Sequence, residues 1–173
     1  MASPPWTYFP QWLDAERARH LLRTGWENWP WEQGTVSLFG RLHLEPRRSF
    51  YQADEGCNYR YAGRTLRGMG WHPDLAGLRS DIEAELGTQF NSVLVNAYRN
   101  GHDYMGYHQD NEPELGPHPH VASLSLGASR DLVFRSKTPR KSALCWPCIR
   151  ATCFGCSHLA SRCLSMPCPS ACV

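Results

Sequence analysis

Residues 90–101 read FNSVLVNAYRNG, and residues 121–135 read VASLSLGASRDLVFR. The VLV run in the first stretch is rich in β-branched and apolar residues, which is typical of a strand. The second stretch alternates apolar with small polar side chains, turns at residues 127–129, and continues through residues 131–134, which read DLVF. This pattern predicts a strand that turns and runs back as a hairpin.

Upstream of this framework the sequence predicts two helices and a further strand. Residues 12–24 place their apolar side chains at helical spacing. Residues 73–86 begin with a proline and are followed by Gly87, both of which favour a helix with these ends. Residues 35–44 alternate as a strand, whereas residues 47–70 are polar and aromatic and predict loops with short strands.

Helices that precede a succession of short strands indicate an α+β domain with helices packed on an antiparallel sheet. A double-sheet jelly roll, or double-stranded β-helix, is the expected architecture because it limits exposed sheet edges. The 173 residues suffice for one domain. Without a secretory signal or an apolar run of roughly 20 residues, the protein is expected to be intracellular, with no membrane partner.

Charge and cysteine content divide the chain near residue 137. Residues 1–137 carry 14 Lys and Arg against 16 Asp and Glu, whereas residues 138–173 carry four basic residues and no acidic one. Seven of the eight cysteines also follow residue 137, and strand periodicity stops there. We therefore expect one domain over residues 1–137 and a Cys-rich basic tail, disordered, over residues 138–173.

His108 and Asp110 are the candidate metal ligands. On a strand, residues two apart point to the same face, so this imidazole and this carboxylate would converge. Such a pair suits a 2-His-1-carboxylate site for non-haem Fe(II), which leaves positions open for a co-substrate and O₂. A lone H-x-D pattern recurs by chance, so the assignment depends on the motifs around it.

Those motifs closely resemble the AlkB family of Fe(II)/2-oxoglutarate dioxygenases, and most of all its branch acting on duplex DNA. The ordered series is FNSVLVNAYRNG (residues 90–101), HQDNEPEL (108–115) and VASLSLG (121–127), preceded by the lid-like PRR (46–48) and YRYAG (59–63). The resemblance covers residues 34–137, implies a jelly roll, and makes that domain incomplete at its C-terminus.

The resemblance assigns iron and 2-oxoglutarate to four residues. His108 and Asp110 would be the first two iron ligands, and Asn96 and Tyr98 would hydrogen-bond 2-oxoglutarate. Family chemistry then implies oxidative dealkylation of 1-methyladenine or 3-methylcytosine in DNA, with RNA as an alternative substrate. Because the target atom lies on a base-pairing edge, the base must leave the stack.

The resemblance assigns the nucleic acid to four further residues. Tyr61 would stack on the flipped base, Arg48 and Arg60 would lie near the DNA, and Glu112 would contact the base edge or support the site. An ordinary sheet aromatic is the alternative role for Tyr61. The protein is expected to be a monomer, nuclear if eukaryotic and cytoplasmic if bacterial.

After residue 137 the chain departs from the family, whose distal His and 2-oxoglutarate-binding Arg are not recognisable. His158 is the candidate third ligand, although no strand pattern surrounds it, and His118 and His120 are expected to be exposed in a Pro-rich loop. A frameshift, retained intron or alternative splicing would explain the change. We expect a poorly active, marginally folded chain with exposed sheet edges.

Two alternatives stay open. One is a catalytically inactive nucleic-acid-binding protein with a zinc-binding tail, since Cys145/Cys148 and Cys153/Cys156 form two C-x-x-C pairs. Their separation is much shorter than the roughly 12–20 residues of ordinary zinc modules, so no zinc is expected there. The other is a 2-oxoglutarate oxygenase acting on protein, which the lid-like Arg/Tyr segment disfavours.

Overall fold

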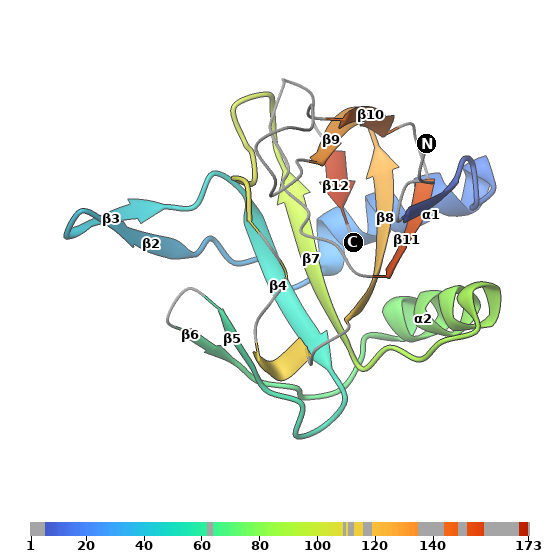
Figure 1. Ribbon diagram of the computed structural model, residues 1–173, viewed down its shortest axis with the longest axis horizontal. Helices are drawn as coiled ribbons and strands as arrows, with labels where there is room; N and C mark the ends of the chain where they lie inside the picture. Colours follow the sequence, from blue (N-terminus) through green and yellow to red (C-terminus); the bar gives the residue numbers. More distant parts are fainter. Residues whose placement is uncertain are drawn as a thin grey trace.

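The computed structural model describes residues 6–61, 64–108, 110, 113–115, 119–134, 144–148, 152–157 and 170–172. Its elements in chain order are β1 (Trp6–Phe9), α1 (Ala15–Asn28), β2 (Thr35–Leu38), β3 (Arg41–Leu44), β4 (Arg48–Ala53), β5 (Tyr59–Tyr61), β6 (Arg64–Leu66), α2 (Pro73–Leu86), β7 (Ser92–Tyr98), η1 (Pro113–Leu115), β8 (His120–Gly127), β9 (Arg130–Phe134), β10 (Leu144–Cys148), β11 (Thr152–Ser157) and β12 (Ser170–Cys172). The predicted α+β jelly-roll class is confirmed (Figure 1).

Within the described residues the larger sheet has six strands in the order β1-β11-β8-β12-β7-β4, with every neighbouring pair antiparallel. β9 pairs with β10 in a second sheet. Trp6 of β1 stacks on Phe134 of β9 with ring centroids 4.3 Å apart, so an aromatic pair joins the two sheets. The hairpins β2–β3 and β5–β6 extend on the β4 side of the molecule (Figure 1).

Capping residues account for both ends of α2 and for the start of α1, whose bounds, Ala15–Asn28, differ at both ends from the expected residues 12–24. The Asp14 side chain accepts hydrogen bonds from the backbone N–H groups of Glu16 and Arg17, so α1 starts later than the expected residue 12. Pro73 opens α2, and Gly87 closes it in the left-handed conformation at φ 63°. The predicted helix over residues 73–86 is therefore confirmed at both ends.

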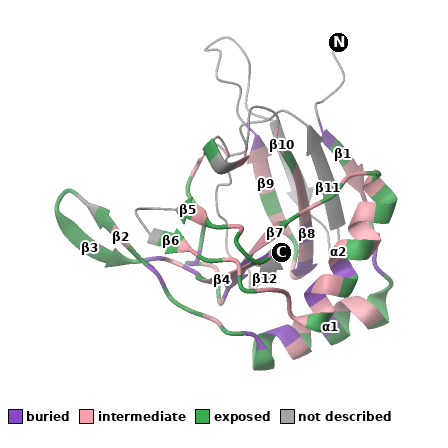
Figure 2. Cartoon of the chain, turned by 90° about the horizontal axis from the view of Figure 1, so that it is seen from below, coloured by how far each residue is buried: buried purple, intermediate pink, exposed green. Residues whose placement is uncertain are grey.

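One face of the larger sheet packs against the helices and forms the core. Phe50 of β4 lies opposite Val95 of β7, so both side chains point to this face. They form one buried cluster with apolar residues of both helices, of the segments flanking α1 and of β8: Leu13, Leu21, Trp29, Leu75, Leu78, Leu124 and Leu126. Figure 2 shows the buried residues lining the helices and strands where they meet.

The other face of the same strands is more polar. Because side chains alternate along a strand, Ser49 of β4 lies opposite Asn96 of β7, and Tyr51 lies opposite Leu94. In β8 the serines of the SLSL run alternate with the buried leucines in the same way. The alternation seen in the sequence thus separates a core face from a face suited to polar ligands.

Residues 35–44, expected to be one strand, form the β2–β3 hairpin instead. Thr35 pairs with Leu44, and the chain reverses at Phe39 and Gly40, with φ angles of 52° and 75°. Two consecutive residues at positive φ match the twist of a tight hairpin. The turn combines an aromatic residue with glycine, a pair that the alternation alone does not mark as a reversal.

The hairpin expected from residues 121–134 is also wrong in its pairing. Both strands form, but β9 turns away from β8 and pairs with β10, with Phe134 opposite Leu144. Beyond residue 137, where the sequence shows no strand periodicity, β11 pairs with β8, and the short β12 lies between β7 and β8.

In the part of the chain that the structure describes, no helix is long and apolar enough to cross a membrane.

Candidate metal and co-substrate site

His108 and Asp110 face each other just beyond the long loop that follows β7. The His108 Nε2 atom lies 3.3 Å from Asp110 Oδ1, and both side chains are partly buried. Nδ1 of the same ring lies 3.0 Å from the Gly106 carbonyl oxygen. With its proton on Nδ1, donated to that carbonyl, the ring turns Nε2 toward the carboxylate, which is the tautomer suited to a metal ligand.

This pair fits two positions of a metal site. Two cis ligands at about 2.1 Å from a first-row metal stand about 3 Å apart, close to the observed separation. Among the residues that the structure describes, no third His, Cys, Asp or Glu gathers with them. The candidate third ligand His158 lies outside the described residues.

The protonation of His108 depends on its neighbours. Burial disfavours the charged imidazole, but the hydrogen bonds to Asp110 and to the Gly106 carbonyl outweigh it and raise the pKa of His108. Arg47 acts in the opposite direction through its positive charge. A proton and a metal ion would therefore compete for Nε2.

Asn96 and Tyr98 lie on one face of β7, as the sequence predicts. Asn96 is 8% exposed, and its Oδ1 accepts a hydrogen bond of 3.0 Å from Arg47 Nε. Arg47 is itself buried and forms an ion pair of 3.2 Å with the buried Glu45. The ring of Tyr98 is buried beneath the Arg130 guanidinium, whose central carbon lies 4.4 Å from the ring centroid.

Arg47, which the sequence did not single out, contacts Asn96 and so joins the candidate site, whereas the predicted role of Arg48 near the DNA is separate from this contact. Along β4 the register places Arg48 opposite Ala97, on the face that Phe50 also occupies. Arg47 has the parity of Ser49, which lies opposite Asn96, and so it reaches the polar face. Once the partner strand of β4 is known, the alternation of side chains around residue 47 predicts that Arg47 lies on the polar face.

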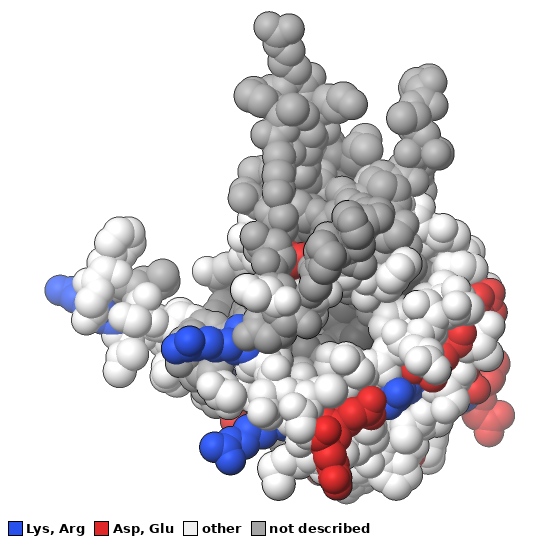
Figure 3. Space-filling model, turned by 60° about the horizontal axis from the view of Figure 1, so that its bottom comes forward, with Lys and Arg blue, Asp and Glu red and all other residues white. Residues whose placement is uncertain are grey.

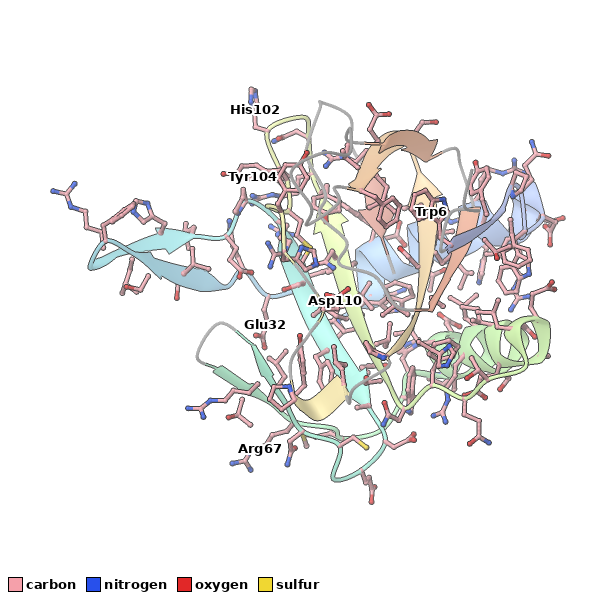
Figure 4. The ribbon with its side chains drawn as sticks, viewed as in Figure 1. Trp6, Glu32, Arg67, His102, Tyr104 and Asp110 are labelled. Atoms are coloured by element: carbon pink, nitrogen blue, oxygen red, sulfur yellow. The ribbon has the colours of Figure 1, made fainter. Side chains whose placement is uncertain are left out.

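The β5–β6 hairpin, which contains the lid-like motif, is attached to the polar side of β4. Tyr59 of β5 stacks on Tyr51 of β4 with ring centroids 5.9 Å apart, and the Tyr51 hydroxyl donates to the Cys57 carbonyl. Arg60 is exposed on this hairpin. In Figure 4, Asp110 lies over the sheet between this hairpin and the segment that carries Tyr104.

Several predicted site residues fall outside what the structure describes. The side chain of Tyr61 is among them, and so are Glu112 and His118. Of the tail cysteines, Cys145, Cys148, Cys153 and Cys156 have a described backbone but no described side chain, so the zinc alternative lies outside the described residues. His120 opens β8 and is exposed, as expected.

The β2–β3 hairpin is a second feature that the sequence analysis missed. Its tip residue Phe39 is 105% exposed, and Leu42 and Leu44 on β3 are also largely exposed. Figure 3 shows the hairpin projecting from the molecule with a basic group at its far end, while acidic side chains lie along the opposite side of the molecule. Three exposed apolar side chains on one hairpin make it a candidate contact surface.

The chain matches the family described as the 2OG-Fe(II) oxygenase superfamily over residues 5–153. This range extends past residue 137, where the motif series ends. The solved structure of OsALKBH1 superposes over 100% of this chain and 86% of its own with a TM-score of 0.57, at 12% identity. At this sequence identity, the likeness shows that the two proteins share a fold.

Similar sequences occur among proteins named as demethylases and dioxygenases. The DNA oxidative demethylase ALKBH2 of Homo sapiens is 42% identical over 61% of this chain and 40% of its own length. The alpha-ketoglutarate-dependent dioxygenase alkB homolog 3 of Homo sapiens is 36% identical over 76% of this chain and 46% of its own. The ALKBH2 of Arabidopsis thaliana is 34% identical over 80% and 41%. This chain thus spans less than half the length of these relatives.

Proposed function

We propose that this chain, which belongs to the 2OG-Fe(II) oxygenase superfamily, carries the iron-binding part of an enzyme that oxidatively dealkylates bases in DNA. The observation that carries the proposal is the facing pair of His108 Nε2 and Asp110 Oδ1, 3.3 Å apart beside the polar face of the sheet. The relatives named as DNA oxidative demethylases support DNA as the substrate class. The substrates that we propose are 1-methyladenine and 3-methylcytosine.

The described residues would hold Fe(II) and orient 2-oxoglutarate. His108 and Asp110 supply two ligands, and the Gly106 carbonyl keeps the imidazole in the required orientation. Arg47 holds the Oδ1 end of the Asn96 amide, which orients its NH₂ group as a donor to a carboxylate of 2-oxoglutarate. Bound Fe(II) with O₂ would supply the oxidation of the N-alkyl carbon, with 2-oxoglutarate oxidised to succinate and CO₂, and the carbon would leave as an aldehyde.

The two hairpins are the proposed contacts with the nucleic acid. On β2–β3 the fully exposed Phe39 can enter a gap between base steps, as apolar wedges do in other DNA-binding proteins. On the β5–β6 hairpin, which the Tyr51–Tyr59 stack attaches to β4, Arg60 would bind a phosphate and Tyr61 would stack on a flipped base. Outside the hairpins, Arg48, exposed at the start of β4, and Glu112 are further proposed contacts with the nucleic acid.

Metal binding is the first test. Under anaerobic conditions Fe(II) and 2-oxoglutarate should give a metal-to-ligand charge-transfer band with the purified protein. His108→Ala and Asp110→Ala should each weaken metal binding by at least about 100-fold, because each removes a direct ligand. His102→Ala is the matched control, since His102 is exposed in the loop after β7. Equal bands in all four proteins would exclude the proposed site.

Turnover is the second test, and it separates the enzyme from its alternative. Release of formaldehyde and succinate from an oligonucleotide with one 1-methyladenine or 3-methylcytosine would support dealkylation. The second candidate function is nucleic-acid binding without turnover, and it rests on the sequence beyond residue 137, which lacks the family's distal His and Arg motif. Tight binding of the oligonucleotide with no released product would favour it.

A further inference from the structure

Charged side chains hold the loop that connects β7 to His108, one from β9 and others from within the loop and the end of β7. From β9, Arg130 donates one hydrogen bond of 2.9 Å to the Asp103 carbonyl oxygen and another of 2.9 Å to the Asn100 carbonyl oxygen. The same guanidinium covers the ring of Tyr98. One planar side chain thus contacts the end of β7 and two backbone carbonyls of the loop.

The carboxylate of Asp103 holds the loop from within. Asp103 is 4% exposed and accepts three hydrogen bonds from Arg99, one from its backbone N–H at 2.9 Å and two from its guanidinium at 2.7 and 2.9 Å. The ion pair is bidentate, the arrangement with the best-defined geometry for arginine and a carboxylate. The loop therefore begins in a single, well-ordered turn.

Further hydrogen bonds hold the part of the loop between this turn and His108. The backbone N–H of Tyr104 donates to the Pro46 carbonyl at 2.8 Å, which ties the loop to the segment that carries Arg47. Two residues later Gly106 supplies the carbonyl that orients the His108 ring. The chain from Tyr98 to His108 is thus anchored to β9, to β7 and to the start of β4 before it reaches the proposed ligand.

We propose that Arg130 and Asp103 are positioning residues that order the β7–His108 loop and thereby hold His108 at the metal site. Neither residue touches the proposed metal; both act through the loop backbone. The part of this inference that concerns the metal rests on the proposed function, whereas the ordering of the loop does not. Placement of a ligand within a few tenths of an ångström is what a preorganised site requires.

Hydrogen exchange in the metal-free protein tests the loop directly. Four backbone amides report on the loop because they donate hydrogen bonds within it or from it: those of Arg99, His102, Asp103 and Tyr104. In Arg130→Met, and likewise in Asp103→Asn, these amides should exchange at least about tenfold faster, while the amides of central β7 should keep their rates. Unchanged loop exchange would overturn the proposal, and so would equal acceleration throughout the sheet.

Two further variants are needed. One tests whether the shape of the Arg130 guanidinium matters beyond its charge, and the other tests whether removal of any comparable arginine has the same effect. Arg130→Lys keeps a cation over Tyr98 but cannot bond two carbonyls in the same fork, so it should leave the loop amides fast. Arg79→Met is the matched control, because the Arg79 guanidinium also covers an aromatic ring (Trp71) and donates to the oxygens of two residues (Asp54, Glu83), but it lies on α2. Wild-type loop exchange in Arg130→Lys, or fast loop exchange in Arg79→Met, would contradict the proposed role.

Cobalt binding then tests the link to the metal site. The absorption of Co²⁺ titrated into the protein should show about tenfold weaker binding in Arg130→Met and an unchanged affinity in Arg79→Met. Equal affinity in wild type and Arg130→Met would overturn the link. If wild type itself binds no Co²⁺, the proposed function fails, and the exchange rates still decide whether Arg130 orders the loop.

Discussion

Single residues of the candidate site depend on partners that are distant in the sequence. Arg47 and Asn96 are 49 positions apart, yet their side chains share a buried hydrogen bond, and the positive charge of Arg47 is matched by Glu45. A buried charge without its partner is costly, so these three side chains support one arrangement. The amide of Asn96 is oriented by this network before any ligand binds.

Asp103 gives the protein a defined pH dependence. Hydrogen bonds from Arg99 lower the pKa of the Asp103 carboxyl and outweigh the effect of burial, which raises it. A lowered folded-state pKa contributes stability above the unfolded value of about 3.9, and this contribution is lost as the pH falls through the folded value. We expect the stability difference between wild type and Asp103→Asn to narrow below about pH 4.

Urea unfolding at several pH values measures this difference. The other carboxylates with lowered pKa values, Asp54 and Glu83, are present in both proteins and cancel. A difference that stays constant from neutral to acidic pH would show that Asp103 contributes no charge-dependent stability.

At the level of elements, two glycines should respond in opposite directions to substitution by alanine. Gly77 lies inside α2, where an added Cβ would meet no atom within 4 Å, so Gly77→Ala should stabilise the protein by about 0.5–1 kcal/mol. At Gly68 the added Cβ would lie 2.2 Å from the Asp54 carbonyl oxygen and 2.6 Å from that of Cys57. Gly68→Ala should therefore destabilise by about 1–3 kcal/mol.

Thermal or urea unfolding of the two variants tests this contrast. Both changes add the same methyl group, so the chemistry of the side chain is matched, and only the surroundings differ. Equal shifts of the same sign would contradict the tight backbone approach at Gly68.

The β2–β3 hairpin should contribute to nucleic-acid binding without contributing to stability. Phe39 is fully exposed, so Phe39→Ala removes no packing contact of the folded chain. If its ring stacks on bases, the substitution should weaken binding of a methylated duplex by about tenfold, within the 1–3 kcal/mol typical of one base–aromatic stack. Fluorescence anisotropy measures the affinity, and Met69→Ala, at another largely exposed apolar residue, is the control. Equal affinities would exclude Phe39 from the interface.

At the scale of the whole molecule, one aromatic pair joins the sheets. Trp6 is 8% exposed and stacks on Phe134, which lies in the smaller sheet. Trp6→Ala should lower the free energy of unfolding by about 3–5 kcal/mol, a large part of the 5–15 kcal/mol typical of a domain. Trp26→Ala, at a tryptophan that is 42% exposed on α1, should cost far less. Similar losses in the two variants would mean that the Trp6 stack adds little to the joining of the sheets.

The fold class and the family were predictable because local patterns and motif order report them directly. Alternating leucines and serines predicted β8, and Pro73 with Gly87 predicted both ends of α2. The family resemblance is confirmed by the superfamily match and by the alkB homologues among the similar sequences. The roles of the individual site residues stay predictions until metal binding is measured.

What the sequence by itself determined was the position of α2, β7 and β8 and the spacing of His108 and Asp110, because side-chain periodicity and helix-capping residues are local properties. The tertiary structure decided which sheet β9 joins, that Arg47 rather than Arg48 contacts Asn96, and that Arg130 reaches the Asp103 carbonyl 27 positions away. These contacts depend on strand register and on the closure of loops. A shift of one residue in register reverses the face of every side chain, and no local pattern specifies the partner strand.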